Sequence, residues 1–146
     1  MREEDFCATF LSVGRWEEKY PDQLKALHDS GRFEIGTHSN THPDMGGMSA
    51  QDIRNELGVS CDIIEKVTGE RPELFRPPYG SYSDVLINTA SSLGLTTIQW
   101  DVDTLDWKGL SAGEIAERVL GSVRNGSIVL MHTNGETPGE ALPLLL

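Results

Sequence analysis

The chain has 146 residues and a formal net charge of −11 at pH 7, from 12 Lys and Arg against 23 Asp and Glu. The length fits one domain with a sizeable core, well short of the roughly 250 residues of a complete eight-unit β/α barrel. The acidity argues against nucleic acid and anionic membrane surfaces as partners, because both select clustered Lys and Arg. No stretch reaches the roughly 18 apolar residues of a membrane span, and Met1–Asp5 is too acidic for the start of a signal peptide.

Strand-like and helix-like segments alternate through the first part of the sequence. The expected strands are Phe6–Val13, Arg32–Thr37 and Leu74–Phe75. The expected helices are Tyr20–Ser30, Ser49–Gly69 and Ser83–Leu93. Ser49 can cap the second of these helices, and glycines follow the other two. The cysteines, Cys7 in a strand and Cys61 in a helix, are predicted as two buried thiols rather than a disulfide.

The same alternation continues to the end of the sequence. The expected strands are Thr96–Val102 and Ser127–Met131. One expected helix runs from the capping box Ser111–Glu114 to about Asn125, and another from Thr137 to Leu146. Apolar strands that alternate with helices predict an α/β fold, in which helices cover a parallel sheet.

Residues whose side chains could bind a metal or take part in catalysis follow these strands rather than precede them. They are His38, Arg76, Asp103, Asp106 and His132. The carboxyl ends of neighbouring parallel strands meet at one edge of a sheet, where open α/β and barrel folds place their chemistry. This arrangement predicts a metal-using hydrolase.

His38 and His42 are the candidate metal ligands. Their spacing of four would place both imidazoles on one side of a helical turn, within reach of one Zn²⁺. Such a site needs a third ligand. The alternative is a surface turn with two solvated histidines, and Pro43 argues against a long helix here.

Two further clusters could complete a site. Two prolines and Gly80 would hold Arg76 and Tyr79 on a stiff platform, the alternative being a structural turn with Arg76 paired to a surface carboxylate. The segment Asp101–Trp107 could supply a carboxylate that orients a histidine and an indole that packs against a sugar ring. Its alternative is a solvated acidic loop with Trp107 in the core. His132 alone could be a strand-end histidine bonded to the backbone.

Taken together, four motifs resemble the NodB-type polysaccharide deacetylases, carbohydrate esterase family four. They are Ala8-Thr9-Phe10, His38-Ser39-Asn40-Thr41-His42, Arg76-Pro77-Pro78-Tyr79-Gly80, and the pair Asp106-Trp107 with Leu130-Met131-His132. The resemblance covers nearly the whole chain, and it implies a distorted seven-unit β/α barrel. Residues 1–146 would then be one NodB homology domain, truncated at both ends.

The resemblance also implies a role for each site residue. His38 and His42 would hold a divalent metal, usually Zn²⁺. Arg76, Tyr79, Asp106 and His132 would be the catalytic set: the arginine braces the base, the backbone N–H of the tyrosine binds the oxyanion, and the aspartate tunes the final histidine. The residues that would contact substrate are Pro78, Trp107 and Leu130.

One family motif is absent. Family members begin with a strand that ends in Thr-Phe-Asp-Asp-Gly, whose aspartates supply the base and the third metal ligand, and this sequence has no such segment. The barrel is therefore expected to be incomplete, without its first β/α unit. The chain could be a fragment of a deacetylase or a naturally shortened relative. An exposed sheet edge could then favour self-association.

The expected function is a metal-dependent hydrolase that removes N-acetyl groups from amino-sugar polymers such as peptidoglycan or chitin, cleaving a carbon–nitrogen bond that is not a peptide bond. The partner is an N-acetylated glycan. Two alternatives stay open: a catalytically impaired relative that binds glycan, and an amidohydrolase that acts on small amides. The location is unknown from the sequence, and it would be extracytoplasmic or cell-wall associated if the chain is like the family.

Overall fold

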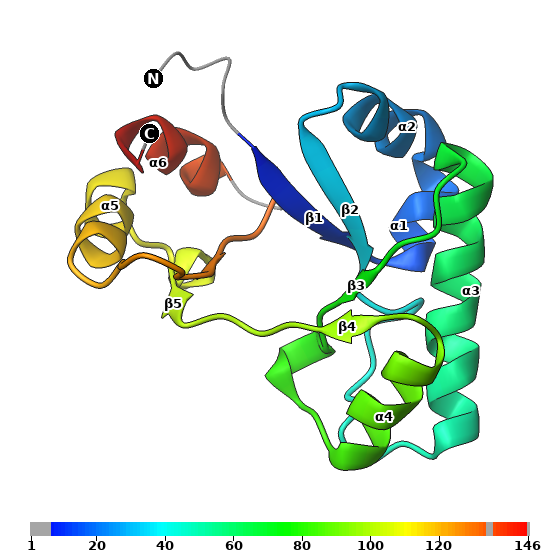
Figure 1. Cartoon of the computed structure of the whole chain (residues 1–146). Helices are drawn as coiled ribbons and strands as arrows, with labels where there is room; N and C mark the ends of the chain where they lie inside the picture. Colours follow the sequence, from blue (N-terminus) through cyan, green and yellow to red (C-terminus); the bar gives the residue numbers. More distant parts are fainter. Residues whose placement is uncertain (1–6, 134–135, 146) are drawn as a thin grey trace. The chain divides into compact units, whose positions relative to one another are not determined.

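The structure is a computed structural model that describes residues 7–133 and 136–145 (Figure 1). The chain divides into two compact units. The N-terminal unit is Cys7–Ile98, and the C-terminal unit contains the described residues from Gln99 onward. Each unit has its own sheet and its own helices, so each is described by itself.

The N-terminal unit contains a four-stranded parallel sheet in the order β1-β2-β3-β4. Its strands are β1 (Ala8–Ser12), β2 (Phe33–Thr37), β3 (Leu74–Phe75) and β4 (Thr96–Thr97). Register pairs Ser12 with Thr37, Thr37 with Phe75, and Phe75 with Thr97. The last residue of every strand therefore lies at one level, and the segments that follow the strands begin along one edge of the sheet.

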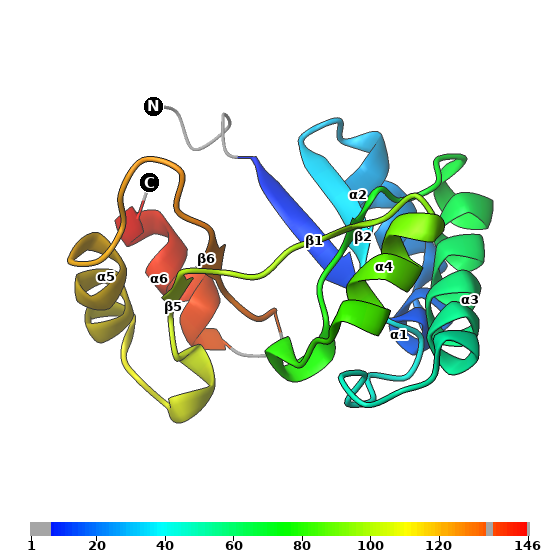
Figure 2. The same ribbon diagram turned by 60° about the horizontal axis from the view of Figure 1, so that its bottom comes forward.

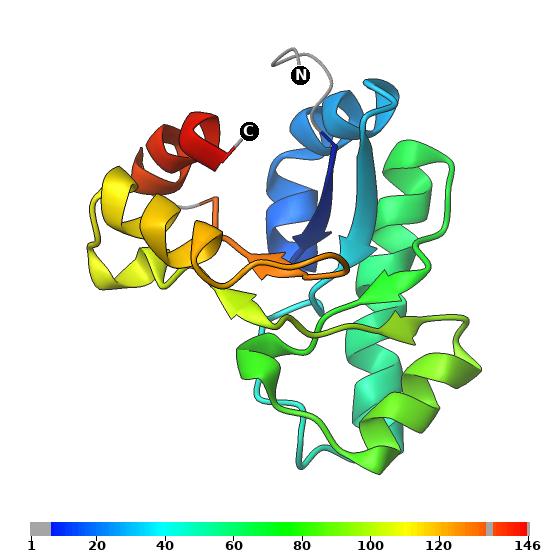
Figure 3. The same ribbon diagram turned by 60° about the vertical axis from the view of Figure 1, so that its left-hand side comes forward.

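Four helices and one short 3₁₀ turn accompany this sheet. They are α1 (Gly14–Lys19), α2 (Pro21–Asp29), α3 (Ala50–Thr68), η2 (Pro78–Gly80) and α4 (Asp84–Ser92). The longest, α3, contacts α1, α2 and α4 and passes next to β2 (Figures 1 and 3). Its first turn is capped by the Ser49 hydroxyl, which accepts a hydrogen bond from the N–H of Asp52. It ends at Thr68, and Gly69 follows as the cap with a φ of 82°. Both ends match the predicted signals.

Apolar side chains of α3 explain why this helix is fixed in place. Ile53, Leu57 and Cys61 pack into a core shared with Phe75 of β3. Burying each Leu or Ile side chain stabilises the fold by roughly 1.5–3 kcal/mol. The helix is therefore a rigid support for any polar residue that it carries between these anchors.

The C-terminal unit has a two-stranded parallel sheet, β5 (Val102–Asp103) and β6 (Val129–Leu130). The 3₁₀ turn η3 (Asp106–Lys108) follows β5. Two helices, α5 (Ala112–Leu120) and α6 (Glu136–Leu145), pack side by side (Figure 2). Its core contains Val102, Ile115, Val119 and Ala141.

The predicted α/β class with parallel strands is confirmed, and most elements lie within a residue or two of their expected bounds. The predicted strand over Thr96–Val102 is wrong as one element. Residues 96–97 pair with β3 and residues 102–103 pair with β6, so the chain between them belongs to neither sheet. Composition does not specify the pairing partner, and the partner decides where a strand begins and ends.

Other expectations also need correction. The helix predicted to reach Asn125 ends at Leu120, where Gly121 follows as the cap. The strand predicted over Ser127–Met131 contains only Val129 and Leu130. Helix α1 was not predicted, because its six residues carry no apolar periodicity. Cys7 is exposed rather than buried, and Cys61 is buried as expected. Phe6 lies outside the described residues.

No helix in the described part of the chain is long and apolar enough to cross a membrane. Among the described strands, β1 pairs only with β2 and so forms an edge of the sheet. Self-association through such an edge stays a prediction.

Candidate functional site

The segment that carries His38 and His42 leaves the carboxyl end of β2 as an irregular loop. The predicted helical turn is wrong: Ser39 has a φ of 72° and His42 a φ of 62°, values that no right-handed helix contains. The two imidazoles are nevertheless neighbours, with ring centroids 4.8 Å apart and planes at 72°. The loop thus brings the two rings together, as the spacing predicted, by a different backbone path.

The ring of His38 is oriented by the next strand. Its Nδ1 lies 2.7 Å from the carbonyl oxygen of Arg76, and because a carbonyl only accepts, Nδ1 carries the proton and donates. Nε2 then carries the lone pair, which is the form of imidazole that binds a metal. A backbone carbonyl in this position is a common outer-shell partner of histidine ligands.

The Arg76–Gly80 segment follows β3 and lies beside the histidine loop. Pro77 and Pro78 are buried, and Tyr79 takes a φ of 59°. The Tyr79 ring is 71% exposed, and its centroid is 4.7 Å from that of His42. Burial lowers the pKa of Arg76. The sheet edge therefore places the candidate metal ligands, Arg76 and Tyr79 in one neighbourhood.

The C-terminal unit holds the second polar group. The Asp106 carboxylate accepts a hydrogen bond from the backbone N–H of His132 at 2.6 Å and one from its Nδ1 at 2.7 Å. Only 1% of the Asp106 side chain is exposed, against 43% of the His132 side chain. A buried carboxylate thus holds a partly exposed imidazole with Nε2 directed away from it. The alternative of a solvated acidic loop does not describe Asp106.

The remaining predicted residues fall in different environments. Trp107 is 66% exposed, so it is not a core residue, and Lys108 lies over its ring. Leu130 is buried in β6, and Pro78 is buried in the other unit. The substrate contacts proposed for these three residues stay predictions. Asp103 accepts a hydrogen bond from the N–H of Leu105 and thereby shapes the turn that leads into η3.

Two carboxylates near the histidine loop were not predicted. Glu56 of α3 accepts hydrogen bonds from the N–H groups of Asn40 and Thr41 and from the Thr41 hydroxyl. Glu17 of α1 is fully buried and accepts hydrogen bonds from Ser12 and Ser60. The sequence carried no signal for either contact, since Glu56 lies on the polar face of a predicted helix and Glu17 lies outside every predicted element.

Glu17 ends a chain of hydrogen bonds that begins in the histidine loop. The N–H of His42 donates to the Ser39 hydroxyl, and the N–H of Ser39 donates to the Thr37 hydroxyl. That hydroxyl donates to Ser60, whose own hydroxyl donates to Glu17. Burial raises the pKa of Glu17 to about 7, although the hydrogen bonds from Ser12 and Ser60 partly oppose this rise.

The histidine pair fits two positions of a divalent metal site. Neutral imidazole nitrogens suit Zn²⁺, and the two rings lie at neighbouring positions with one tautomer fixed. Within the described residues, no cluster of three or more His, Cys, Asp and Glu forms that could hold an ion. Any further ligands would come from water or from groups outside this set.

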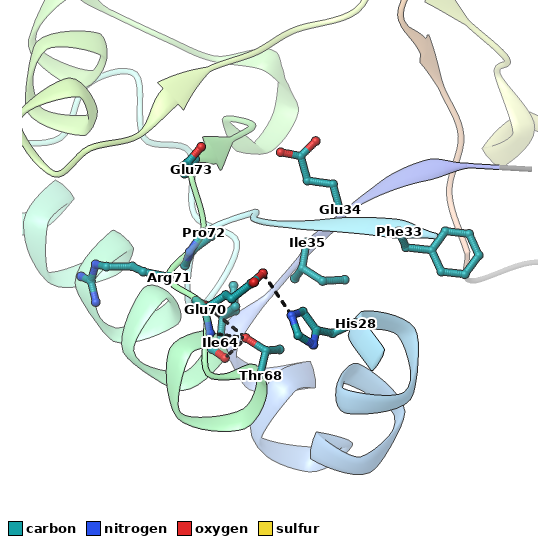
Figure 4. A pocket seen from close by; sticks show the side chains of 10 residues that line it. All are labelled: His28, Phe33, Glu34, Ile35, Ile64, Thr68, Glu70, Arg71, Pro72 and Glu73. Carbon is teal, nitrogen blue, oxygen red and sulfur yellow. Dashed lines mark hydrogen bonds and ion pairs between the residues drawn. The ribbon is translucent and has the colours of Figure 1, made fainter. Parts of the chain in front are cut away.

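A cavity of about 440 Å³ in the N-terminal unit is separate from this site (Figure 4). Phe33, Glu34 and Ile35 of β2 line it together with His28 and residues of the α3 end. These residues lie at the start of β2, whereas His38 follows its end. The imidazole of His28 bridges Asp29 and Glu70 in this region.

Parallel strands that alternate with helices, with polar side chains directly after the strand ends, are typical of β/α barrel enzymes. The polysaccharide deacetylase family model matches residues 1–98. The chain belongs to the polysaccharide deacetylase family.

Individual relatives support the same assignment. The chain is 34% identical over 139 residues to a peptidoglycan-N-acetylglucosamine deacetylase of Bacillus cereus. The matched residues are 95% of this chain and 49% of that protein. It matches a crystal structure of a carbohydrate esterase family 4 pseudoenzyme from Bacillus anthracis with a TM-score of 0.94 and 35% identity, over 99% of this chain and 50% of that one. It also matches the structure of a family 4 carbohydrate esterase from Streptomyces lividans in complex with acetate, with a TM-score of 0.91 and 31% identity. This match covers 99% of this chain and 74% of that one.

The chain spans about half the length of the first curated relative and of the first structural neighbour. Its fold is that of part of a NodB-type barrel domain, as expected from the resemblance.

Proposed function

We propose that this protein takes part in metal-dependent hydrolysis of N-acetyl groups on an amino-sugar polymer of the peptidoglycan or chitin type. The observation that carries the proposal is the pair of adjacent imidazoles, His38 and His42, with the His38 tautomer fixed by the carbonyl of Arg76. The similarity to a peptidoglycan-N-acetylglucosamine deacetylase supports the substrate class. By the same similarity, we propose an extracytoplasmic or cell-wall location.

In this proposal His38 and His42 hold Zn²⁺ through their ring nitrogens. Zn²⁺ bound there supplies Lewis-acid polarisation of the acetamide carbonyl. The backbone N–H of Tyr79 donates to the developing oxyanion. Arg76, at the same sheet edge, is proposed to orient the carboxylate that acts as the general base.

His132 is proposed as the general acid. Asp106 accepts from Nδ1, so the proton that the ring gives up in the reaction is the one on Nε2. Water adds to the acetamide carbonyl carbon and gives its proton to the general base, the Nε2 proton goes to the leaving nitrogen as the C–N bond breaks, and acetate and a free amino group result. Trp107 is proposed to pack against the sugar, and Leu130 and Pro78 to shape the acetyl contact.

Acetate release from N-acetylglucosamine oligomers and from peptidoglycan, by the purified protein loaded with Zn²⁺, tests the proposal. We expect release, and a loss of about 10²-fold or more in the His132→Ala variant, since general-acid help is commonly worth this much. Equal release by this variant contradicts the role of His132. Faster release from small acetamides than from any glycan would instead identify an amidohydrolase of small substrates.

A glycan-binding protein without catalytic activity is the second candidate. It is favoured by the lack of a three-residue metal cluster among the described residues and by the similarity to a family pseudoenzyme. Binding of the same oligomers without acetate release, at saturating Zn²⁺, would support this candidate over the first.

A further inference from the structure

The histidine loop needs support that its own backbone does not provide. It leaves β2 after Thr37, forms no regular element before α3, and contains two non-glycine residues with positive φ. Left-handed backbone disfavours residues with a Cβ, so such a conformation persists only when its surroundings impose it. The contacts that impose it decide where the two imidazoles point.

Two groups of contacts hold the loop, one from α1 and one from α3. On the α1 side, the N–H groups of Gly14 and Arg15 donate to the carbonyl oxygens of Ser39 and Asn40 at 3.0 and 3.1 Å. These bonds occupy the carbonyl oxygens of Ser39 and Asn40 and leave the N–H groups of Asn40 and Thr41 to another partner.

Glu56 supplies that partner from α3. Its Oε2 accepts from the N–H of Asn40 at 2.9 Å and from the N–H of Thr41 at 3.0 Å, and its Oε1 accepts from the Thr41 hydroxyl at 2.7 Å. Hydrogen bonds to an ionised carboxylate are roughly twice as strong as neutral ones. One carboxylate therefore fixes the peptide units midway between the two histidines.

The position of Glu56 on the helix makes this contact rigid. The neighbouring residues Ile53 and Leu57 are fully buried in the core, so the helix cannot shift without breaking that packing. The carboxylate itself is partly buried and reaches from this fixed backbone to the loop. Support of this kind is what a binding site needs if its ligands are to keep their geometry.

We infer that Glu56 is a positioning residue for the imidazoles of His38 and His42, acting by holding the Asn40–Thr41 peptide units and touching neither ring. The part of this inference that concerns metal affinity rests on the proposed function. The part that concerns the loop does not.

The test compares Glu56→Gln with Glu65→Gln, a matched control. Glu65 lies on the same helix but forms an exposed ion pair with Arg71 and makes no contact with the loop. Glutamine at position 56 keeps the shape but offers one acceptor atom in place of two. In the metal-free protein we expect the Asn40 and Thr41 amide hydrogens to exchange about tenfold to a hundredfold faster in Glu56→Gln only, as loss of hydrogen bonds to a charged group implies.

Cobalt titration of the same proteins is the second readout. We expect Co²⁺ affinity to fall in Glu56→Gln by up to about the 10- to 100-fold that loss of a direct hydrogen-bond partner of a ligand costs, and to stay unchanged in Glu65→Gln. If exchange responds while the unaltered protein binds no Co²⁺, the proposed metal function fails and the inference about Glu56 stands.

Unchanged exchange at Asn40 and Thr41 in Glu56→Gln, or an equal change in the control, overturns the inference. Should Glu56→Gln not fold, Thr41→Val provides the same test. It deletes the hydroxyl donor to Oε1 and keeps the carboxylate, so exchange at Asn40 should rise by a smaller factor, and no rise overturns the inference.

Discussion

The imidazole of His38 is oriented by the main chain of Arg76, whose carbonyl oxygen lies 2.7 Å from Nδ1. The two residues follow β2 and β3, and the N–H of Arg76 in turn donates to the carbonyl oxygen of Thr37. A side chain from one strand end is therefore fixed by the backbone of the next. Because the acceptor belongs to the sheet edge, substitution of the Arg76 side chain leaves it in place.

This geometry predicts which histidine substitutions weaken metal binding. His38→Ala and His42→Ala should each lower Zn²⁺ affinity by at least the roughly 10- to 100-fold that loss of an outer-shell partner costs. His28→Ala is the matched control in the same unit, since His28 pairs with Asp29 and Glu70 away from the loop. Isothermal titration with Zn²⁺ measures all three, and equal weakening by His28→Ala would refute the assignment of the pair.

The contact between Asp106 and His132 predicts a fixed tautomer. Asp106 accepts from both the backbone N–H and the ring Nδ1, and an asparagine offers only one acceptor for the two donors. Asp106→Asn should therefore release Nδ1 and raise the share of the tautomer protonated at Nε2. Nitrogen-15 chemical shifts of the His132 ring report this directly, and identical shifts in the two proteins would contradict it.

Glu17 predicts a pH dependence of stability. Its pKa is raised from 4.5 to about 7 in the folded protein, so between these values the folded state holds a proton that the unfolded state has lost. The free energy of unfolding should therefore fall as pH rises from about 4.5 to 7, by at most about 3 kcal/mol from this group.

Urea unfolding at pH 5, 7 and 8.5 measures this dependence. Glu17→Gln should remove most of this fall in the free energy of unfolding, because its amide stays neutral. Compared with the unaltered protein, the variant should be more favourable at pH 8.5 than at pH 5. Glu18→Gln is the matched control, since Glu18 is the exposed neighbour of Glu17. If the free energy of unfolding of both variants changes with pH as it does in the unaltered protein, burial of a neutral Glu17 is not the cause of that pH dependence.

Two glycines predict opposite effects of the same substitution. A Cβ added at Gly14 would lie 2.3 Å from the Asn40 Oδ1 and 3.1 Å from its Cα, whereas a Cβ at Gly58 meets nothing within 4 Å. Gly14→Ala should cost about 1–3 kcal/mol and displace the histidine loop. Gly58→Ala, inside α3, should stabilise by roughly 0.5–1 kcal/mol. Thermal unfolding of both variants measures these changes in stability. Stabilisation by Gly14→Ala would show that the histidine loop shifts at no cost and would contradict the prediction.

The positions of His38 and Arg76 could be predicted from the sequence because they depend on a general rule. Strands that run parallel and in register end at one level, so residues that follow them must gather. The hydrogen bond between Asp106 and His132 was likewise expected, although from the family resemblance rather than from spacing. Assignments of this kind need only the order of strands and the residues at their ends.

The support of the histidine loop could not be predicted in this way. Glu56 reaches the Asn40 and Thr41 amides only because α3 packs at one particular position relative to β2. Sequence patterns do not predict that position, since it depends on how Ile53 and Leu57 pack in the core. The same holds for Glu17, whose burial depends on the unpredicted helix α1.

Left-handed backbone in the described part of the chain is confined, glycines aside, to Ser39, His42, Tyr79 and Leu105. Each such residue carries a penalty of roughly 1–2 kcal/mol. His42 and Tyr79 are themselves proposed site residues, and Ser39 and Leu105 are neighbours in sequence of His38 and Asp106. Glycine or asparagine at these four positions would relieve that penalty. Laboratory evolution for heat tolerance without a demand for activity should therefore alter these loops early, and the variants that survive best should be the ones that bind metal least.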